Sequence, residues 1–166
     1  MNFLSRAALG LAIAPLFAGA AMANLVTNGD FESGNTGFTS SYTNNQADCT
    51  GPAVYAVNGN AQSCHPSFVA VTPHGGQLMM TLNGATSSGV EVWNSGPITV
   101  VNGGLYNFSA WATSVYPNDP ANLEFLINGV SIGTLQLTSG TPDWSQFSQN
   151  WFANTTSATL SIIDLD

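Results

Sequence analysis

Beyond residue 23, short runs of apolar and β-branched residues alternate with turn signals, and no segment keeps a helical period. The dipeptide Asn-Gly best tolerates the positive φ angles of tight turns. It recurs at 28–29, 58–59, 83–84, 102–103 and 128–129. We expect strands in the intervals between turns, at 78–82, 90–94, 98–101, 105–112, 123–127, 130–137, 147–152 and 158–163.

Alternation within these runs assigns their two faces. In 105–112, Tyr106 and Phe108 share one face and Trp111 points the opposite way. About eight short strands with a turn every dozen residues predict an all-β fold, an antiparallel two-sheet sandwich. Residues 40–67 lack this rhythm, and we expect a long loop there.

Residues 1–23 have the composition of an export signal. Arg6 precedes an apolar run, and Ala21-Met22-Ala23 matches the small-x-small pattern of a cleavage site. We interpret this segment as a secretory signal peptide. A transmembrane anchor is the alternative, although the run is short and is interrupted by two glycines and a proline. Residues 24–166 are enough for one domain, in which we expect no membrane span.

Charge narrows the range of partners. The chain has nine acidic residues and one basic residue, Arg6, with a formal net charge of −8. Removal of residues 1–23 takes Arg6 away and leaves a charge of −9. Without Lys or Arg the protein cannot neutralise phosphates, so we expect no nucleic-acid partner. Catalysis that needs an Arg or Lys clamp is excluded for the same reason.

Cys49 and Cys64 are the only two cysteines. In an exported chain an even count favours a disulfide, here closing a loop rich in Asn, Gly, Pro and Ser. Closure of a loop of about 15 residues contributes roughly 3 kcal/mol through chain entropy. A zinc site made by Cys49, Cys64, His65 and His74 is the alternative, although the spacing fits no common zinc pattern.

Several stretches resemble one group of bacterial proteins. They are NLVTNGDFESG at 24–34, HPSF at 65–68, LMMTLNGA at 78–85, the strand around Trp93, GLYNFSAW at 104–111, LEFLING at 123–129 and TSATLSII at 156–163. In them the chain resembles secreted proteins of the PEP-CTERM-sorted kind, whose body is a jelly-roll similar to galactose-binding-like carbohydrate-binding modules. The resemblance implies a galactose-binding-like jelly-roll over 24–166, located outside a bacterial cell or on its surface.

Members of this group usually continue with a further strand, a Pro-Glu-Pro sorting motif, an apolar helix and a basic tail. This sequence ends at Asp166, so we expect the last strand and the sorting signal to belong to a longer parent protein. On that expectation, residues 158–163 or the neighbouring strand form a sheet edge with unpaired backbone groups.

In related jelly-rolls, an NGxFE turn and a late Asp on the final strand hold a structural calcium ion. The resemblance therefore implies Glu32 as a side-chain ligand, with Asp30 as a second candidate through its carbonyl or carboxylate. Asp164 and Asp166 precede the expected position of the partner Asp. Calcium prefers several carboxylate and carbonyl oxygens at a flexible turn. A glycine-rich turn with solvated carboxylates is the alternative.

Exposed aromatic rings surrounded by polar groups are the feature that a carbohydrate-binding surface requires. Trp111 points away from the expected core, Tyr116 lies in the following loop, and Trp93 lies in a strand beside an asparagine. We take these three as candidate carbohydrate-binding residues, and ordinary core packing is the alternative for each. We assign Trp144 and Trp151 to core or turn packing.

The sequence holds no recognisable catalytic motif. G-x-S-x-G, H-E-x-x-H and a phosphate-binding loop are all absent from it. Glu91 and Glu124 are the only pair that invites comparison with a glycosidase, but each lies in an expected strand among apolar residues. We therefore expect a protein that is not an enzyme.

Two function hypotheses follow. In the first, the protein is an exported, non-catalytic β-sandwich that binds or associates with extracellular polysaccharide. In the second, it is a structural surface or matrix protein that makes protein–protein contacts. A groove lined by rings and polar groups favours the first. A large exposed apolar patch without clustered polar groups favours the second.

Overall fold

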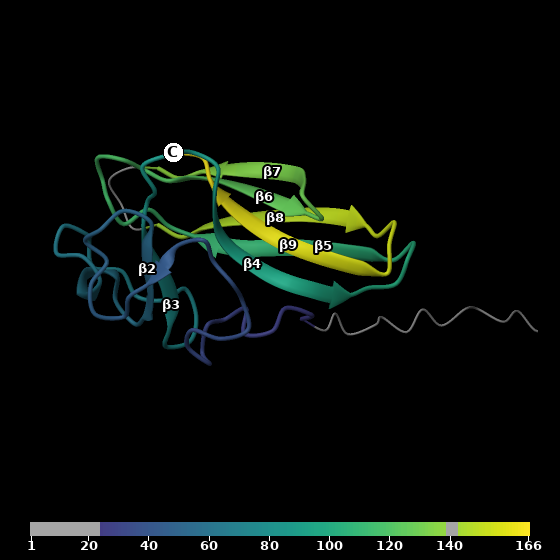
Figure 1. The fold of residues 1–166 in the computed structure, drawn as a ribbon, viewed down its shortest axis with the longest axis horizontal. Helices are drawn as coiled ribbons and strands as arrows, with labels where there is room; N and C mark the ends of the chain where they lie inside the picture. The colour runs from purple at the N-terminus through teal and green to yellow at the C-terminus, as the bar shows by residue number, and fades with distance from the viewer. Residues whose placement is uncertain (1–23, 139–142) are drawn as a thin grey trace, which may run out of the picture.

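Strands joined by turns make up most of the ordered chain (Figure 1). The computed structural model describes residues 24–138 and 143–166, so the predicted signal peptide at 1–23 lies outside the described residues. Within the described ranges the one helical element is a 3-10 turn, η1 (Ala61–Ser63). No helical segment there has the length and apolarity needed to cross a membrane. The strands are β1 (Thr43–Asn44), β2 (Val54–Asn58), β3 (Met79–Asn83), β4 (Val90–Thr99), β5 (Leu105–Ala112), β6 (Asn122–Ile127), β7 (Val130–Gln136), β8 (Ser145–Phe152) and β9 (Ser157–Asp164).

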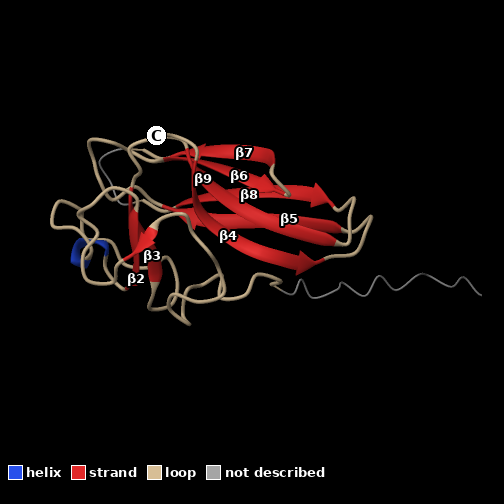
Figure 2. Ribbon diagram, viewed as in Figure 1, coloured by secondary structure: helices blue, strands red, loops and turns tan. Residues whose placement is uncertain are grey.

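The strands form three sheets, which Figure 2 shows in red. A four-stranded antiparallel sheet has the order β4-β9-β6-β7, and β5 and β8 form an antiparallel pair. In the third sheet, β2 pairs antiparallel with β3 and parallel with β1. The predicted all-β class with antiparallel sheets is therefore confirmed, and the arrangement is consistent with a β-sandwich.

Three phenylalanines join the four-stranded sheet to the two-stranded one. Phe125 of β6 is 0% exposed and stacks on Phe147 of β8, with ring centroids 3.9 Å apart and planes 3° apart. Phe108 of β5 meets these two rings edge to face, at 5.8 and 6.2 Å. Because large aromatic side chains dominate the energetics of cores, this cluster holds the two layers together.

The predicted alternation of β5 is confirmed. Phe108 is buried, and Tyr106 packs against the same core cluster. Trp111, on the opposite face, is 44% exposed. The two faces of β5 therefore separate core residues from surface residues as the sequence pattern indicates.

The predicted hairpin after β6 is also present. Ile127 pairs with Val130, and the two residues between them, Asn128 and Gly129, have φ angles of +53° and +76°. Two consecutive positive φ angles are the signature of a type I′ turn, which the Asn-Gly dipeptide favours. Every second residue of β6 is buried, as a strand with one core-facing side requires.

The expectation of a long loop over residues 40–67 is wrong, because this region contains β1, β2 and η1. Tyr55 and Val57 of β2 enter the main core, and Ala56 between them packs with the two cysteines on the other face. A strand that is buried on both faces shows no alternation of polar and apolar residues. The sequence of β2 therefore lacks the alternation of polar and apolar residues that identifies a strand with one exposed face.

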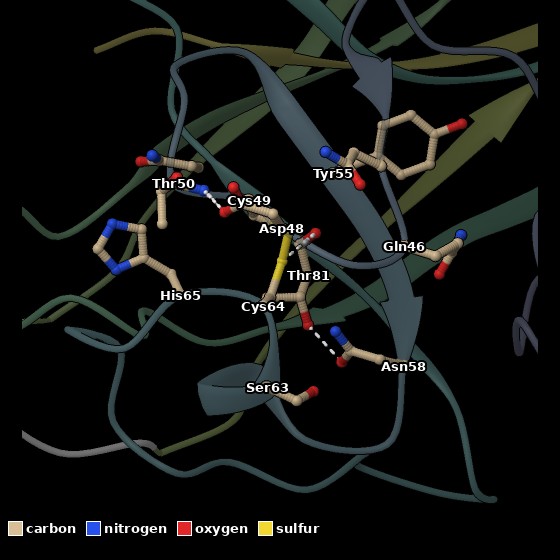
Figure 3. Close-up of a disulfide and its surroundings, with 12 residues drawn as sticks. Gln46, Asp48, Cys49, Thr50, Tyr55, Asn58, Ser63, Cys64, His65 and Thr81 are labelled. Atoms are coloured by element: carbon tan, nitrogen blue, oxygen red, sulfur yellow. Dashed lines mark hydrogen bonds between the residues drawn. A yellow bond between two sulfur atoms is a disulfide. The ribbon is translucent and has the colours of Figure 1, made fainter.

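The structure joins Cys49 to Cys64 in a disulfide (Figure 3). Their Cα atoms are 5.0 Å apart, and both side chains are buried. The backbone N–H of Cys49 also donates to the carbonyl of Cys64 at 2.8 Å. The cross-link covers the outer side of β2, and it takes up both thiols that the zinc alternative required.

Two expectations about the four-stranded sheet need correction. The runs predicted at 90–94 and 98–101 form one strand, β4, whose register shifts between Asn94 and Pro97. Residues 158–163 do not form a sheet edge, because β9 pairs with β4 on one side and with β6 on the other. The neighbouring strand β4, which is the other possibility, does lie at the edge of this sheet. Sequence pattern identifies strands, whereas their neighbours are chosen by packing of the whole sheet.

We predict that Phe125→Ala lowers the free energy of unfolding by about 3–5 kcal/mol, because it removes the stacked ring and leaves a cavity between the sheets. Urea denaturation measures the loss. Phe152→Ala is the matched control at a side chain that is 70% exposed. It changes the free energy by less than about 0.5 kcal/mol. Equal losses in the two variants would show that the phenylalanine cluster does not hold the layers together.

Candidate functional site

Trp111 belongs to a group of aromatic rings on the outer side of β5. Its indole stacks on the imidazole of His74, with ring centroids 3.9 Å apart and planes 15° apart. Trp144 meets His74 edge to face at 5.7 Å. We call Trp111, His74 and Trp144 the aromatic triad. Stacking fixes the orientation of the Trp111 ring while leaving 44% of the residue exposed.

The aromatic triad lines a cavity of about 640 Å³. Tyr116, in the loop after β5, lines the same cavity and is 40% exposed. All three predicted carbohydrate-binding residues line this cavity, and two of them, Trp111 and Tyr116, are exposed. Leu78 and Met80 form part of the apolar wall of the cavity, and Asp119 adds a carboxylate to its lining. The volume lies within the range typical of small-molecule sites, about 300–1,000 Å³.

Trp93 also lines this cavity, but it is buried, so the expectation that it forms an exposed platform is wrong. It is 5% exposed and belongs to the main core. Its neighbour Val92 is buried in the same core cluster, at the point where the register of β4 shifts between Glu91 and Trp93. The chain before β1 bridges to β4 at Thr39 and Asn94. Trp93 therefore contacts the cavity only as a buried part of its wall.

Sequence reasoning missed two members of the aromatic triad. The sequence indicates His74 only as a zinc ligand. The packing role predicted for Trp144 is confirmed, because it packs against the cluster of Phe68 and Val71, but its contact with His74 is not predicted. His74 lies in the loop before β3, Trp144 immediately precedes β8, and Trp111 lies near the end of β5. No local pattern connects these three segments, because they meet only through the packing of sheets that lie far apart in the sequence.

Glu32 holds the loop that carries His74. Its Oε1 atom accepts the backbone N–H groups of Gln77, at 2.7 Å, and Leu78, at 2.9 Å. Gly76 has a φ of +74°, and a Cβ atom there would collide with the Glu32 carboxylate. Glycine is therefore required for the close approach as well as for the backbone angle. The first turn of the described chain is thereby fastened to the loop beside the cavity.

The predicted calcium role of Glu32 and Asp30 can be compared with these contacts. Asp30 Oδ1 accepts the N–H of Glu32 at 3.3 Å, and Glu32 Oε1 already accepts two N–H groups. Among residues 24–138 and 143–166, no group of three or more His, Cys, Asp or Glu side chains comes together. Calcium takes six to eight oxygen ligands. These contacts describe a backbone brace, and the calcium role of Glu32 and Asp30 stays a prediction.

Asp164 and Tyr42 form a buried pair at the end of β9. The Tyr42 hydroxyl donates to Asp164 Oδ2 at 2.5 Å, and the N–H of Ala85 lies 3.0 and 3.1 Å from these two oxygens. Both side chains are buried. Burial, together with the neighbouring Asp164 carboxylate, raises the pKa of Tyr42 well above its ordinary value near 10. The pair ties the chain before β1 and after β3 to the four-stranded sheet.

Glu91 and Glu124 lie on the two strands that flank β9, both opposite Ile163. Glu91 Oε2 accepts a hydrogen bond from Asn94 at 2.8 Å. Neither carboxylate lines the cavity at the aromatic triad. A glycosidase requires its two carboxylates to flank a bound sugar. That the protein is not an enzyme stays a prediction from the sequence.

Comparison with known proteins adds no assignment to this site. No protein-family model matches the sequence, and no curated protein matches it significantly. The resemblance to PEP-CTERM-sorted proteins thus stays a prediction. The features that could bind another molecule are the aromatic triad, its cavity and the exposed apolar side chains.

We predict that Tyr42→Phe weakens the alkaline sensitivity of the fold. Because folding raises the pKa of Tyr42, the unfolded chain loses this proton first as pH rises above about 10. The contribution is complete below that pH and is lost as pH rises further. Urea denaturation between about pH 8 and 11 measures the effect, with Tyr116→Phe as the control at an exposed tyrosine. A wild-type slope retained in Tyr42→Phe would contradict the assignment.

We predict that Glu32→Ala costs about 1–2 kcal/mol, because it removes the acceptor of two backbone N–H groups. Glu32→Gln keeps an acceptor oxygen and loses less. Thermal unfolding with and without calcium separates the two roles of Glu32. A calcium-dependent rise in melting temperature that Glu32→Gln abolishes would support the calcium prediction. No calcium effect in either protein would leave Glu32 as a backbone brace.

Proposed function

We propose that the protein is an exported, non-catalytic β-sandwich that binds extracellular polysaccharide at the aromatic triad and its cavity. The observation that carries this proposal is the exposed Trp111 ring, held against His74 on a cavity that Tyr116 also lines. An orientated, half-exposed indole beside a hollow offers a flat apolar face to a ligand without a large loss of side-chain entropy on binding.

The surroundings of Trp111 suit a neutral, hydroxyl-rich ligand. Sugar C–H faces stack on indole rings, and sugar hydroxyls bond to neighbouring polar groups. Tyr116 and Asp119 line the same cavity as Trp111, and Gln146 pairs with Trp111 across β5 and β8. With Arg6 as its only Lys or Arg, the chain offers little attraction to polyanions and favours neutral polysaccharides.

Export and the finer fold assignment are parts of the same proposal. The Cys49–Cys64 disulfide supports an oxidising location, since such bonds persist outside the cytosol. The antiparallel layers support a jelly-roll of the galactose-binding-like type. PEP-CTERM sorting of a longer parent protein rests on the sequence resemblance alone.

A structural surface or matrix protein is the second candidate function. The observation that favours it is a set of exposed apolar side chains, which includes Val101 at 70%, Val130 at 67% and Phe152 at 70%. These side chains lie at the end of the strands remote from Trp111. The two candidate functions therefore depend on different residues and can be separated by mutation.

We predict that Trp111→Ala abolishes retardation of the protein in native gels that contain a neutral polysaccharide to which the wild type binds. Loss of a central aromatic contact weakens binding by about 2 kcal/mol or more, roughly thirtyfold. A panel of neutral and acidic polysaccharides in affinity electrophoresis provides the measurement.

Phe152→Ala is the matched control, because it removes an exposed ring that does not line the cavity. Its migration should equal that of the wild type. If no polysaccharide retards the folded wild-type protein, the proposed function is wrong. If Trp111→Ala is retarded as strongly as the wild type, polysaccharide binds elsewhere.

A further inference from the structure

Exposed apolar side chains gather at one end of the strands. Val101, Leu105, Val130 and Phe152 are exposed by 70%, 51%, 67% and 70%. We call these four residues the apolar tip. They lie in or beside the β4–β5, β6–β7 and β8–β9 connections, at the right-hand end of the sheets in Figure 1. Leu105 and Phe152 are direct cross-strand neighbours, so their side chains adjoin.

The apolar tip lies in an uncharged part of the molecule. No Asp, Glu, Lys, Arg or His occurs at 95–113, 126–137 or 145–162. Glu91 and Glu124 both pair with Ile163, at the opposite end of β9. From Glu91 the chain runs eight positions along β4 to Thr99, which corresponds to about 26 Å. These two carboxylates therefore lie well beyond the Debye length of about 8 Å at physiological salt.

The connections that carry the apolar tip satisfy many of their own backbone N–H groups. The N–H of Gly103 donates to Ala153 at 2.7 Å, and the N–H of Ala153 donates to Gly104 at 2.9 Å. The N–H of Val101 donates to the Tyr106 hydroxyl at 2.8 Å. Further bonds run from Val100 to Thr156, from Gly104 to Val101 and from Asn128 to Thr159. Internal satisfaction of this kind is what transfer into an apolar medium requires, since each unpaired group there is costly.

We propose that the apolar tip inserts into the interfacial region of a lipid membrane. The inserted groups are four apolar side chains, carried on uncharged connections whose backbone is largely bonded within the protein. Transfer of the apolar tip from water into lipid therefore removes no charged group from water. Because the three connections carry no charged residue, attachment depends on apolar contact and does not require anionic lipid.

Competing occupants fit the apolar tip less well. A stable interface with a protein, including a second copy of this chain, places about 20–30 residues on each partner. The apolar tip offers only four large apolar side chains to such an interface, whereas shallow insertion into lipid requires only a few. A lipid surface is also laterally fluid, so it needs no matching shape around the three connections.

Insertion at the tip would leave the aromatic triad accessible. β5 begins at Leu105, and Trp111 follows six positions later, roughly 20 Å along the strand. The cavity with Trp111 and Tyr116 would then face the aqueous side of the membrane. Lipid attachment and polysaccharide binding involve opposite ends of the same strand and can occur together.

Flotation with phosphatidylcholine vesicles tests this inference. The protein is recovered after export from a bacterial host, and mass spectrometry identifies its amino terminus. We expect the wild type to float with the vesicles. The double variant Leu105→Ser/Phe152→Ser should partition at least about tenfold less, because two buried apolar contacts are lost. Partition should change by less than about twofold with added anionic lipid, or between about 0.05 and 0.5 M salt.

The matched control is Trp111→Ser/Tyr116→Ser, which removes two exposed rings from the other end. It should float like the wild type. Val101→Ser/Val130→Ser is a second tip variant in case the first fails to fold, as judged by circular dichroism. Absence of wild-type flotation, or equal loss in tip and control variants, would overturn the inference. A dimer in vesicle-free size exclusion that the tip variants dissolve would also overturn it, since the tip would then bind a second copy.

Discussion

The Phe125 ring lies flat against Phe147 across the space between two sheets, and the surface features of the protein follow from that contact. With Phe108 packed against the same pair, the inner face of β5 is fixed. The pleat of a strand then directs Leu105 and Trp111 outward. One core contact thus determines which side chains of β5 remain for interaction with other molecules.

The aromatic triad depends on contacts that are themselves remote from its rings. His74 is in place because Glu32 accepts two N–H groups from the loop that follows it. The buried pair of Tyr42 and Asp164 joins the flanks of the third sheet to the end of β9. These bonds connect the third sheet to the sandwich and so define the cavity between them. A carboxylate can determine a binding surface in this way without touching the ligand.

The two ends of the sandwich differ in chemistry. One end holds carboxylates, the aromatic triad and the cavity, and the other holds uncharged turns with exposed apolar side chains. The connections at the second end, within 95–113, 126–137 and 145–162, contain no charged residue. The proposed polysaccharide and lipid contacts use these ends separately, which allows one small domain to connect two different materials.

The sequence by itself determined the strands from residue 78 onward, the inner and outer faces of β5 and the Asn128-Gly129 hairpin, because these depend on neighbours within a few residues. It also indicated Cys49 and Cys64 as a pair and Trp111 and Tyr116 as surface rings. Tertiary structure alone decided the burial of Trp93, the double-sided burial of β2, the central place of β9 and the meeting of His74 and Trp144 with Trp111. The physical reason is that coverage of a second face, and contact between distant loops, arise only when whole sheets pack, and no local period in the sequence records that packing.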